Sequence, residues 1–159
     1  HGVALTAAGT VFATMLVAGV VGRLVLGWAA DRAGDATRSL ALHGLVAAAL
    51  SALFILAAPG APWGVMLLLA WLCGFTSASW NGIFLAEIAR LSPPDRVAEA
   101  SSGAIMLCFL GYLLAPSAFA FAVGATGGWV APFLAACALL AAVALLVTAR
   151  RGARGGAAE

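Results

Sequence analysis

Hydrophobic residues follow one another in long runs along this chain, and short polar or glycine- and proline-rich segments separate the runs. A helix needs about 20 residues to cross roughly 30 Å of hydrocarbon. Runs of about this length or more lie at residues 3–29, 39–58, 63–89, 99–124 and 129–149. The pattern predicts an all-α, polytopic integral membrane protein with five transmembrane helices.

Each interruption between the runs has a composition that ends helices. Segment 31–38 is polar, 59–62 reads Pro-Gly-Ala-Pro, 92–95 reads Ser-Pro-Pro-Asp, and 127–128 is a pair of glycines. Such segments stop helices and form turns. Because the connections are short, we expect consecutive helices to be antiparallel neighbours.

The composition excludes two broad classes of protein. Of the 159 residues, 64% are hydrophobic and only 9% are charged. Soluble domains carry about a quarter charged residues, so a water-soluble enzyme is excluded, and disordered chains are poor in hydrophobic residues. The spans also hold no paired catalytic or metal-binding motif, so we expect no enzyme activity, no cofactor and no metal site.

The positions of the basic residues predict the orientation. All eight are arginines, and they fall in or near the first connection, the third connection and the C-terminal segment: Arg23, Arg32, Arg38, Arg90, Arg96, Arg150, Arg151 and Arg154. Cytoplasmic loops are enriched in basic residues. The N-terminus is therefore expected outside, and the transmembrane region 1–149 is expected to lead into a basic cytoplasmic tail, 150–159. Long apolar runs separate the arginines, which excludes a nucleic-acid surface.

Two further features concern the origin of the chain. It contains abundant alanine and glycine and no lysine, which is typical of a GC-rich bacterial gene and favours the bacterial inner (plasma) membrane. It begins at His1 with an apolar run already under way and without a cleavable signal. We therefore expect it to be the C-terminal portion of a longer protein.

The first connection carries a candidate motif. Gly27 and Asp31 are four residues apart, so on a helix they share a face, where glycine permits close approach and the carboxylate can pair with a cation or a helix N-terminus. The alternative is a solvated turn. The motif resembles the loop motif G-x-x-x-D-R-x-G-R of the major facilitator superfamily, with matches at Gly27, Asp31, Arg32 and Gly34. Asp35 occupies the last basic position of that motif, and Arg38 is the candidate substitute.

This resemblance implies that the five runs correspond to helices eight to twelve of a twelve-helix transporter that works by alternating access. Its partners would be the lipid bilayer, a small-molecule solute and the N-terminal helices of the same transporter. Glu87, Arg90 and Arg96 also resemble an acidic-then-basic pattern of the family. It implies a cytoplasmic gate in which Glu87 and Arg96 join Asp31 and Arg32. The alternative is a local pair between Glu87 and Arg90.

Polar residues inside the spans are candidates for the wall of a solute cavity. On a helical wheel the third run places Ser77, Trp80 and Glu87 on one face, and Gly74, Ala78 and Gly82 form a separate stripe suited to helix contact. The candidate cavity residues are Thr10, Thr14, Ser77, Trp80, Asn81, Cys108 and Tyr112. The alternative roles are contacts between helices and, for the threonines, bonds to their own backbone.

Other residues complete this picture. Pro116 predicts a kink in the fourth span. The resemblance implies that the second and fifth spans are peripheral. His43 is expected to snorkel at the inner interface rather than to carry a proton. A cavity wall of Trp80, Asn81, Tyr112 and hydroxyls without a central charge favours a neutral or amphipathic solute if this half dominates recognition, and arginines on the other half would overturn this. No carboxylate lies near the centre of a span, so we expect no proton relay there, and a group for proton coupling is expected in the missing half. The alternatives to a transporter are a small oligomeric or accessory five-span subunit and a membrane-embedded enzyme.

Overall fold

The computed structural model describes residues 4–155. Within them the chain forms six helices: α1 Leu5–Ala33, α2 Ala36–Ala57, α3 Trp63–Ser77, α4 Trp80–Leu91, α5 Val97–Thr126 and α6 Val130–Gly155. Five segments are long and apolar enough to cross a membrane, with α3 and α4 together forming the third. The five predicted spans are confirmed. The first six residues of the expected tail 150–159 continue α6, and 156–159 lie outside the described residues.

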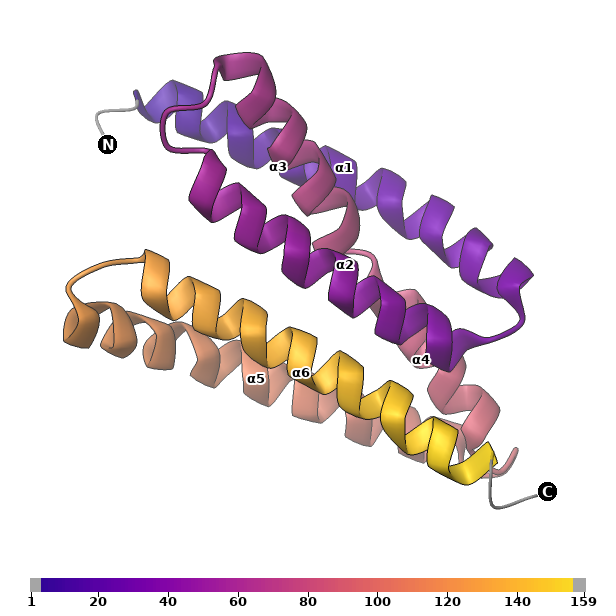
Figure 1. The fold of residues 1–159 in the computed structure, drawn as a ribbon. Coiled ribbons are helices and arrows are strands. Elements are labelled where there is room, and N and C mark those ends of the chain that lie inside the picture. The colour runs from indigo at the N-terminus through magenta and orange to yellow at the C-terminus, as the bar shows by residue number, and fades with distance from the viewer. Residues whose placement is uncertain (1–3, 156–159) are drawn as a thin grey trace.

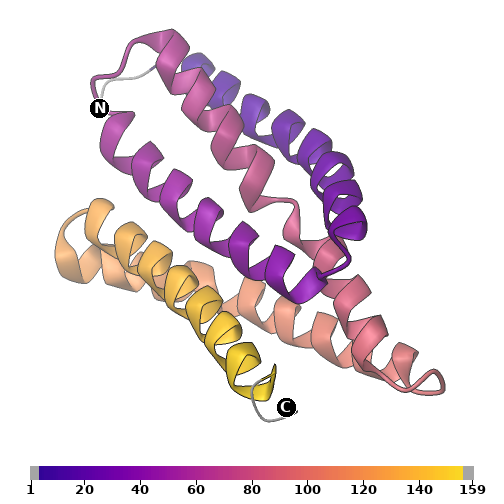
Figure 2. The same ribbon diagram turned by 45° about the vertical axis from the view of Figure 1, so that its right-hand side comes forward.

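The spans run alternately up and down (Figure 1). The first connection, the third connection and the C-terminal end of α6 lie together at one end of the molecule, which we term the basic end. Consecutive spans are antiparallel neighbours, as expected, but most of them are not the pairs that pack most extensively. Instead, α1 packs mainly against α3, and α2 packs against α6 and α3 (Figure 2).

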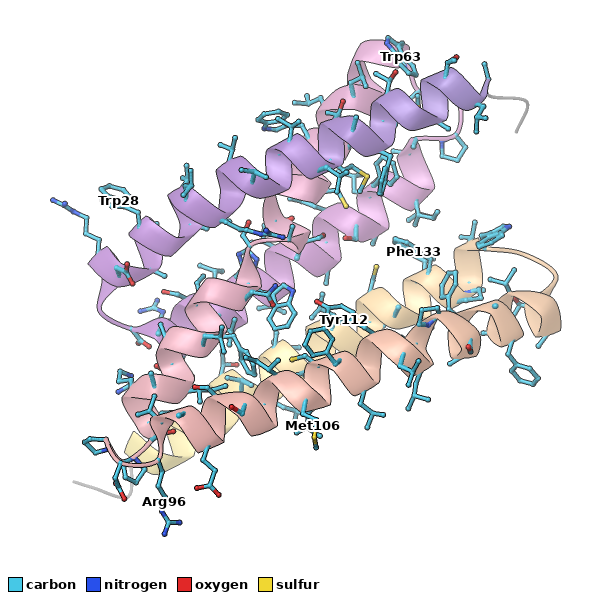
Figure 3. The ribbon with its side chains drawn as sticks, turned by 180° about the vertical axis from the view of Figure 1, so that it is seen from behind. Trp28, Trp63, Arg96, Met106, Tyr112 and Phe133 are labelled. Atoms are coloured by element: carbon cyan, nitrogen blue, oxygen red, sulfur yellow. The ribbon has the colours of Figure 1, made fainter. Side chains whose placement is uncertain are left out.

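The second and fourth spans differ from each other in their surroundings. The α2 helix contacts α1, α3, α4 and α6, so within the described bundle it is central rather than peripheral. In contrast, α5 contributes no buried residue and contacts only α4 and α6 to any extent. Tyr112 projects from α5 toward the rest of the bundle, whereas Met106 projects away from it (Figure 3). The α5 helix continues across Pro116, and the kink there stays a prediction.

Small residues allow α1 and α3 to cross closely. A Cβ atom added at Gly22 would collide with the carbonyl oxygen of Phe75, and one added at Gly74 would collide with the backbone of Met15. A Cβ at Gly19 would lie 2.7 Å from that of Ala78. The predicted contact stripe is therefore confirmed at positions 74 and 78, but a Cβ at Gly82 would meet open space. Glycine at these positions lets dispersion forces hold the two helices together.

The turn between α1 and α2 is built from two residues with defined roles. Gly34 ends α1 in the left-handed conformation, with φ of 66°, which glycine adopts without steric cost. Asp35 then caps α2, because its carboxylate accepts a hydrogen bond of 3.0 Å from the backbone N–H of Arg38. An N-cap needs a short acceptor side chain, which explains why aspartate stands where the resembled motif has a basic residue.

Candidate functional site

The third span is interrupted near its middle. Ala78 and Ser79 separate α3 from α4, with φ and ψ close to −100° and 0°. The N–H of Ser79 bonds to the carbonyl of Thr76, three residues back, so the regular spacing of four is lost. The prediction of one continuous helix over 63–89 was wrong at this point. The cause is local, since Ser77, Ala78 and Ser79 are small and two of them offer hydroxyls that compete with the helical bonds.

Two side chains from other helices hold the carbonyl groups at this break. Arg23 of α1 donates from its Nε atom to the carbonyl oxygen of Ala78 over 3.0 Å. His43 of α2 bonds through Nε2 to the carbonyl oxygen of Thr76 over 2.5 Å. A backbone carbonyl inside a bilayer that lacks its helical bond has no water to bond with, so it needs a partner from elsewhere. The carbonyl of Thr76 also accepts from the N–H of Ser79, so His43 adds a second bond to it. The break is thus a polar junction of three spans.

Arg23 does not lie in the first connection, as the charge pattern suggested. It lies inside α1, about three turns or roughly 15 Å before Ala33. Among the described residues no carboxylate lies within 4 Å of its guanidinium, and only the Nε donor is used. The remaining donors of Arg23 are therefore open to a partner from outside the described chain.

The expectation that His43 snorkels to the interface is also wrong. The residue lies about two turns into α2 and is only 9% exposed. Its neighbours are small, since Ala41, Ala47 and Ala48 of the same helix are buried as well. Burial and a bond to a carbonyl oxygen make His43 part of the junction between helices.

A pocket of about 410 Å³ adjoins this junction, between α2, the broken span and α6. It is mainly apolar, and the residues that matter for its chemistry are His43, Thr76, Ser77 and Trp80. The structure therefore brings two of the candidate cavity residues, Ser77 and Trp80, to one pocket.

The other candidate cavity residues lie elsewhere. Thr10 and Thr14 donate their hydroxyls to carbonyls four residues back in α1. Asn81 is exposed in the first turn of α4, and Cys108 is half-buried in α5. Tyr112 lies with Pro116 in a shallow hollow between α5 and α6. Within the described residues these side chains do not share a cavity, and their role toward a solute stays a prediction.

Glu87 forms a second polar cluster at the basic end. Its side chain is buried, and one carboxylate oxygen accepts a hydrogen bond from the hydroxyl of Thr37 at the start of α2. Arg90 donates from Nε and from an Nη atom to the two carboxylate oxygens, each over 2.7 Å. The local pair of Glu87 and Arg90 is thus present, and Thr37 adds a bond between helices. We term these three residues the clamp.

The remaining members of the expected gate do not join the clamp. Asp31 is exposed, the guanidinium of Arg32 lies 5.4 Å from the ring centre of Trp28, and Arg96 projects away from the bundle (Figure 3). A Cβ at Gly27 would meet open space, so no described helix approaches closely there. Asp35 contributes instead, because it is near enough to act electrostatically on both Glu87 and Arg90. The gate role of Gly27, Asp31, Arg32, Gly34, Arg38 and Arg96 stays a prediction.

Sequence reasoning missed Arg23, His43 and Thr37 as contact residues. A signal existed for Arg23, because the arginine interrupts an apolar run well before its end. For His43 and Thr37 the signal was absent, since their partners are a backbone carbonyl and a side chain some 30 to 50 residues away.

Comparison with known proteins identifies one family. The family model described as Major Facilitator Superfamily matches residues 1–157. No curated protein and no solved structure matches the chain. The match covers nearly the whole sequence, including the motif in the first connection, the broken span and the clamp.

Proposed function

The chain belongs to the Major Facilitator Superfamily, and we propose that it forms the C-terminal part of a secondary active transporter, which moves a small solute by alternating access. The N-terminal helices of the same transporter would supply the opposite wall of the solute path. We further propose that the basic end faces the cytoplasm of a bacterial cell, with the N-terminus of this chain outside, because the arginine-bearing connections meet there.

The observation that carries this proposal is the position of α4 between the break and the clamp. On one side, α1 and α3 cross so closely that a Cβ atom added at Gly22 or Gly74 would collide with the opposite backbone. On the other, α4 is attached through the break at Ala78 and Ser79 and through the bond of Glu87 to Thr37. The α4 helix also packs against α2 and α5, so opening the clamp would remove one of several contacts that hold α4 in place. A helix that moves at one end of the molecule while the other end stays packed is what alternating access needs.

We infer that the solute carries an anionic group. Arg23 brings a guanidinium into a membrane span, where a charge without a partner is costly. Its Nε bond to Ala78 fixes the side chain beside the break and leaves its other donors open. Guanidinium groups recognise carboxylates and phosphates through paired N–H donors. This placement favours an anionic solute over the neutral one expected from the cavity wall, because that expectation did not count Arg23.

Uptake by the intact transporter in proteoliposomes tests both parts. The probes are radiolabelled acetate, lactate and succinate as anions, with glycerol and glucose as neutral solutes. We expect saturable uptake of an anion, and the rate of this uptake should fall at least about tenfold in Arg23→Gln. It should fall less in Arg23→Lys, which keeps the positive charge but lacks the paired N–H donors of the guanidinium. Saturable uptake of a neutral solute that is equal in Arg23→Gln and the parent would overturn the anionic assignment. If the protein takes up none of these probes into the proteoliposomes, this result would contradict the transporter proposal.

A further inference from the structure

His43 has a feature that the transport proposal does not use, which is a free ring nitrogen next to a pocket. We propose that His43 is a proton-binding site, in which Nδ1 takes up a proton from the pocket while Nε2 keeps its bond to the broken third span. Histidine is the side chain whose charge changes nearest to neutral pH. Among the described residues it is also the only histidine, so within the spans no other imidazole competes for this role.

The bond at Nε2 determines which nitrogen is free. A carbonyl oxygen only accepts hydrogen bonds, so Nε2 must donate its proton to Thr76. In the neutral ring Nδ1 then carries a lone pair. Adding a proton at Nδ1 leaves the Nε2–H donor in place, so protonation changes the charge without breaking the contact.

The free nitrogen is open to solvent or solute. No described residue bonds to Nδ1, and every fully buried polar side-chain atom in the described part of the chain has a partner. Nδ1 is therefore not fully enclosed by the described residues. His43 borders the pocket of about 410 Å³ toward α6 and a second one of about 230 Å³ toward α1. A water molecule takes about 30 Å³, and the polar groups of Thr76 and Ser77 offer bonds to it.

The neighbouring helices supply few charges that could oppose or replace this proton. The α3 helix and residues 130–149 of α6 bring none. From α1 comes Arg23, held on the carbonyl of Ala78, with Asp31 and Arg32 near the basic end. From α4 come Glu87 and Arg90, which already bond to each other. A proton on His43 would therefore stand in an apolar pocket, where its charge favours hydration or an anion nearby.

The break links this proton to the rest of the molecule. The carbonyls held by His43 and Arg23 belong to Thr76 and Ala78, two residues apart in the same turn. A positive charge on His43 strengthens its hydrogen bond to the carbonyl of Thr76, and the short backbone between the two residues transmits the effect to the carbonyl of Ala78. By linkage, if a solute bound at Arg23 changes the affinity of His43 for a proton, protonation of His43 changes the affinity for that solute by the same factor. Only this last step rests on the proposed function.

Nuclear magnetic resonance of the full transporter in lipid nanodiscs, with isotope-labelled histidine, tests the site without transport. The His43 signal is the one that disappears in His43→Gln, a variant whose amide still donates to Thr76. We expect a ring protonated at Nε2 alone at about pH 8 and at both nitrogens at about pH 5. A ring that stays neutral over this range in the folded protein would overturn the proposal.

The link to the break has its own readout. Trp80 opens α4 and borders the pocket, so its fluorescence reports on this point when the other tryptophans are replaced by phenylalanine. We expect a pH-dependent emission with the same midpoint as the His43 titration, and its complete loss in His43→Gln. A His43 titration without any change at Trp80 would overturn the link between proton and break. Because neither readout needs a solute, both stand if the transport proposal fails.

Discussion

The Nε atom of Arg23 lies 3.0 Å from the carbonyl oxygen of Ala78, and this bond ties α1 to the point where the third span passes from α3 to α4. One residue earlier in α1, Gly22 lies so close to the third span that an added Cβ atom would meet Phe75 and Ser79. The same stretch of α1 therefore both packs against α3 and holds the start of α4.

Replacing Gly22 with alanine is expected to separate α1 from α3. The new Cβ atom would meet the carbonyl oxygen of Phe75, which belongs to the backbone and cannot turn away. Overpacking of this kind costs about 1 to 3 kcal/mol. Thermal unfolding of the purified protein should show the loss as a lower midpoint.

Gly27→Ala is the matched control for this change. It lies in the same helix, and its Cβ would meet nothing within 4 Å. Alanine is the better helix former by about 0.5 to 1 kcal/mol, so stability should stay the same or rise slightly. Equal destabilisation by both variants would mean that the crossing is not as close as described.

Replacing Glu87 with glutamine is expected to loosen the clamp. The amide removes the charge that Arg90 pairs with, while an oxygen remains for Thr37. Because the side chain of Arg90 is 61% exposed, water screens this pair, and its loss should shift the equilibrium between a closed and an open clamp only by about two- to fivefold. Labelling of a cysteine at position 77, from the basic end and in a background without native cysteines, should increase by about that factor.

Arg96→Gln serves as the comparison for the clamp. Arg96 lies in the same connection but projects away from the bundle, so the same labelling should not change (Figure 3). An increase in Arg96→Gln equal to that in Glu87→Gln would instead support the wider gate that the family resemblance implies.

Removing the cap of α2 separates the two roles of Asp35. In Asp35→Ala the first turn of α2 loses the acceptor for the backbone N–H of Arg38, at a cost of about 1 kcal/mol. Asp35→Asn keeps a capping oxygen and removes the charge, so stability should stay near that of the parent. Thermal unfolding distinguishes them, and a loss of similar size in both variants would show that the charge near Arg90 matters more than the cap.

The five spans could be predicted from the sequence because membrane insertion depends on the length and hydrophobicity of each run alone. The contact residues Gly74 and Ala78 were also predictable, since small residues four apart on an apolar helix indicate a close crossing. The hydropathy pattern does not show which other helix packs against these residues. The neighbours α1 and α3, and α2 and α6, follow from the fit of side chains across the whole bundle.

The polar junction shows a second limit of sequence reasoning. A helical wheel assumes an unbroken helix, so it could not describe residues beyond Ala78 correctly. The bonds of Arg23 and His43 end on backbone carbonyls, and a carbonyl has the same chemistry at every position. Which carbonyl is free depends on where the helix breaks. Charged residues inside a span can be found from the sequence, but the backbone carbonyls that they bind cannot.

Asn81 allows a direct test of the solute path. In the described chain both Asn81 and Met106 are exposed, yet Met106 projects away from the bundle on α5 (Figure 3). Exposure to lipid and exposure to water differ in chemistry, because thiol reagents attack the thiolate and a thiolate forms only where water reaches it. In a background without native cysteines, Asn81→Cys should react with a water-soluble thiol reagent at least about tenfold faster than Met106→Cys, a difference of about 1.4 kcal/mol in barrier. Equal and negligible rates would place Asn81 in a helix contact, and equally fast rates would show that α5 also borders water.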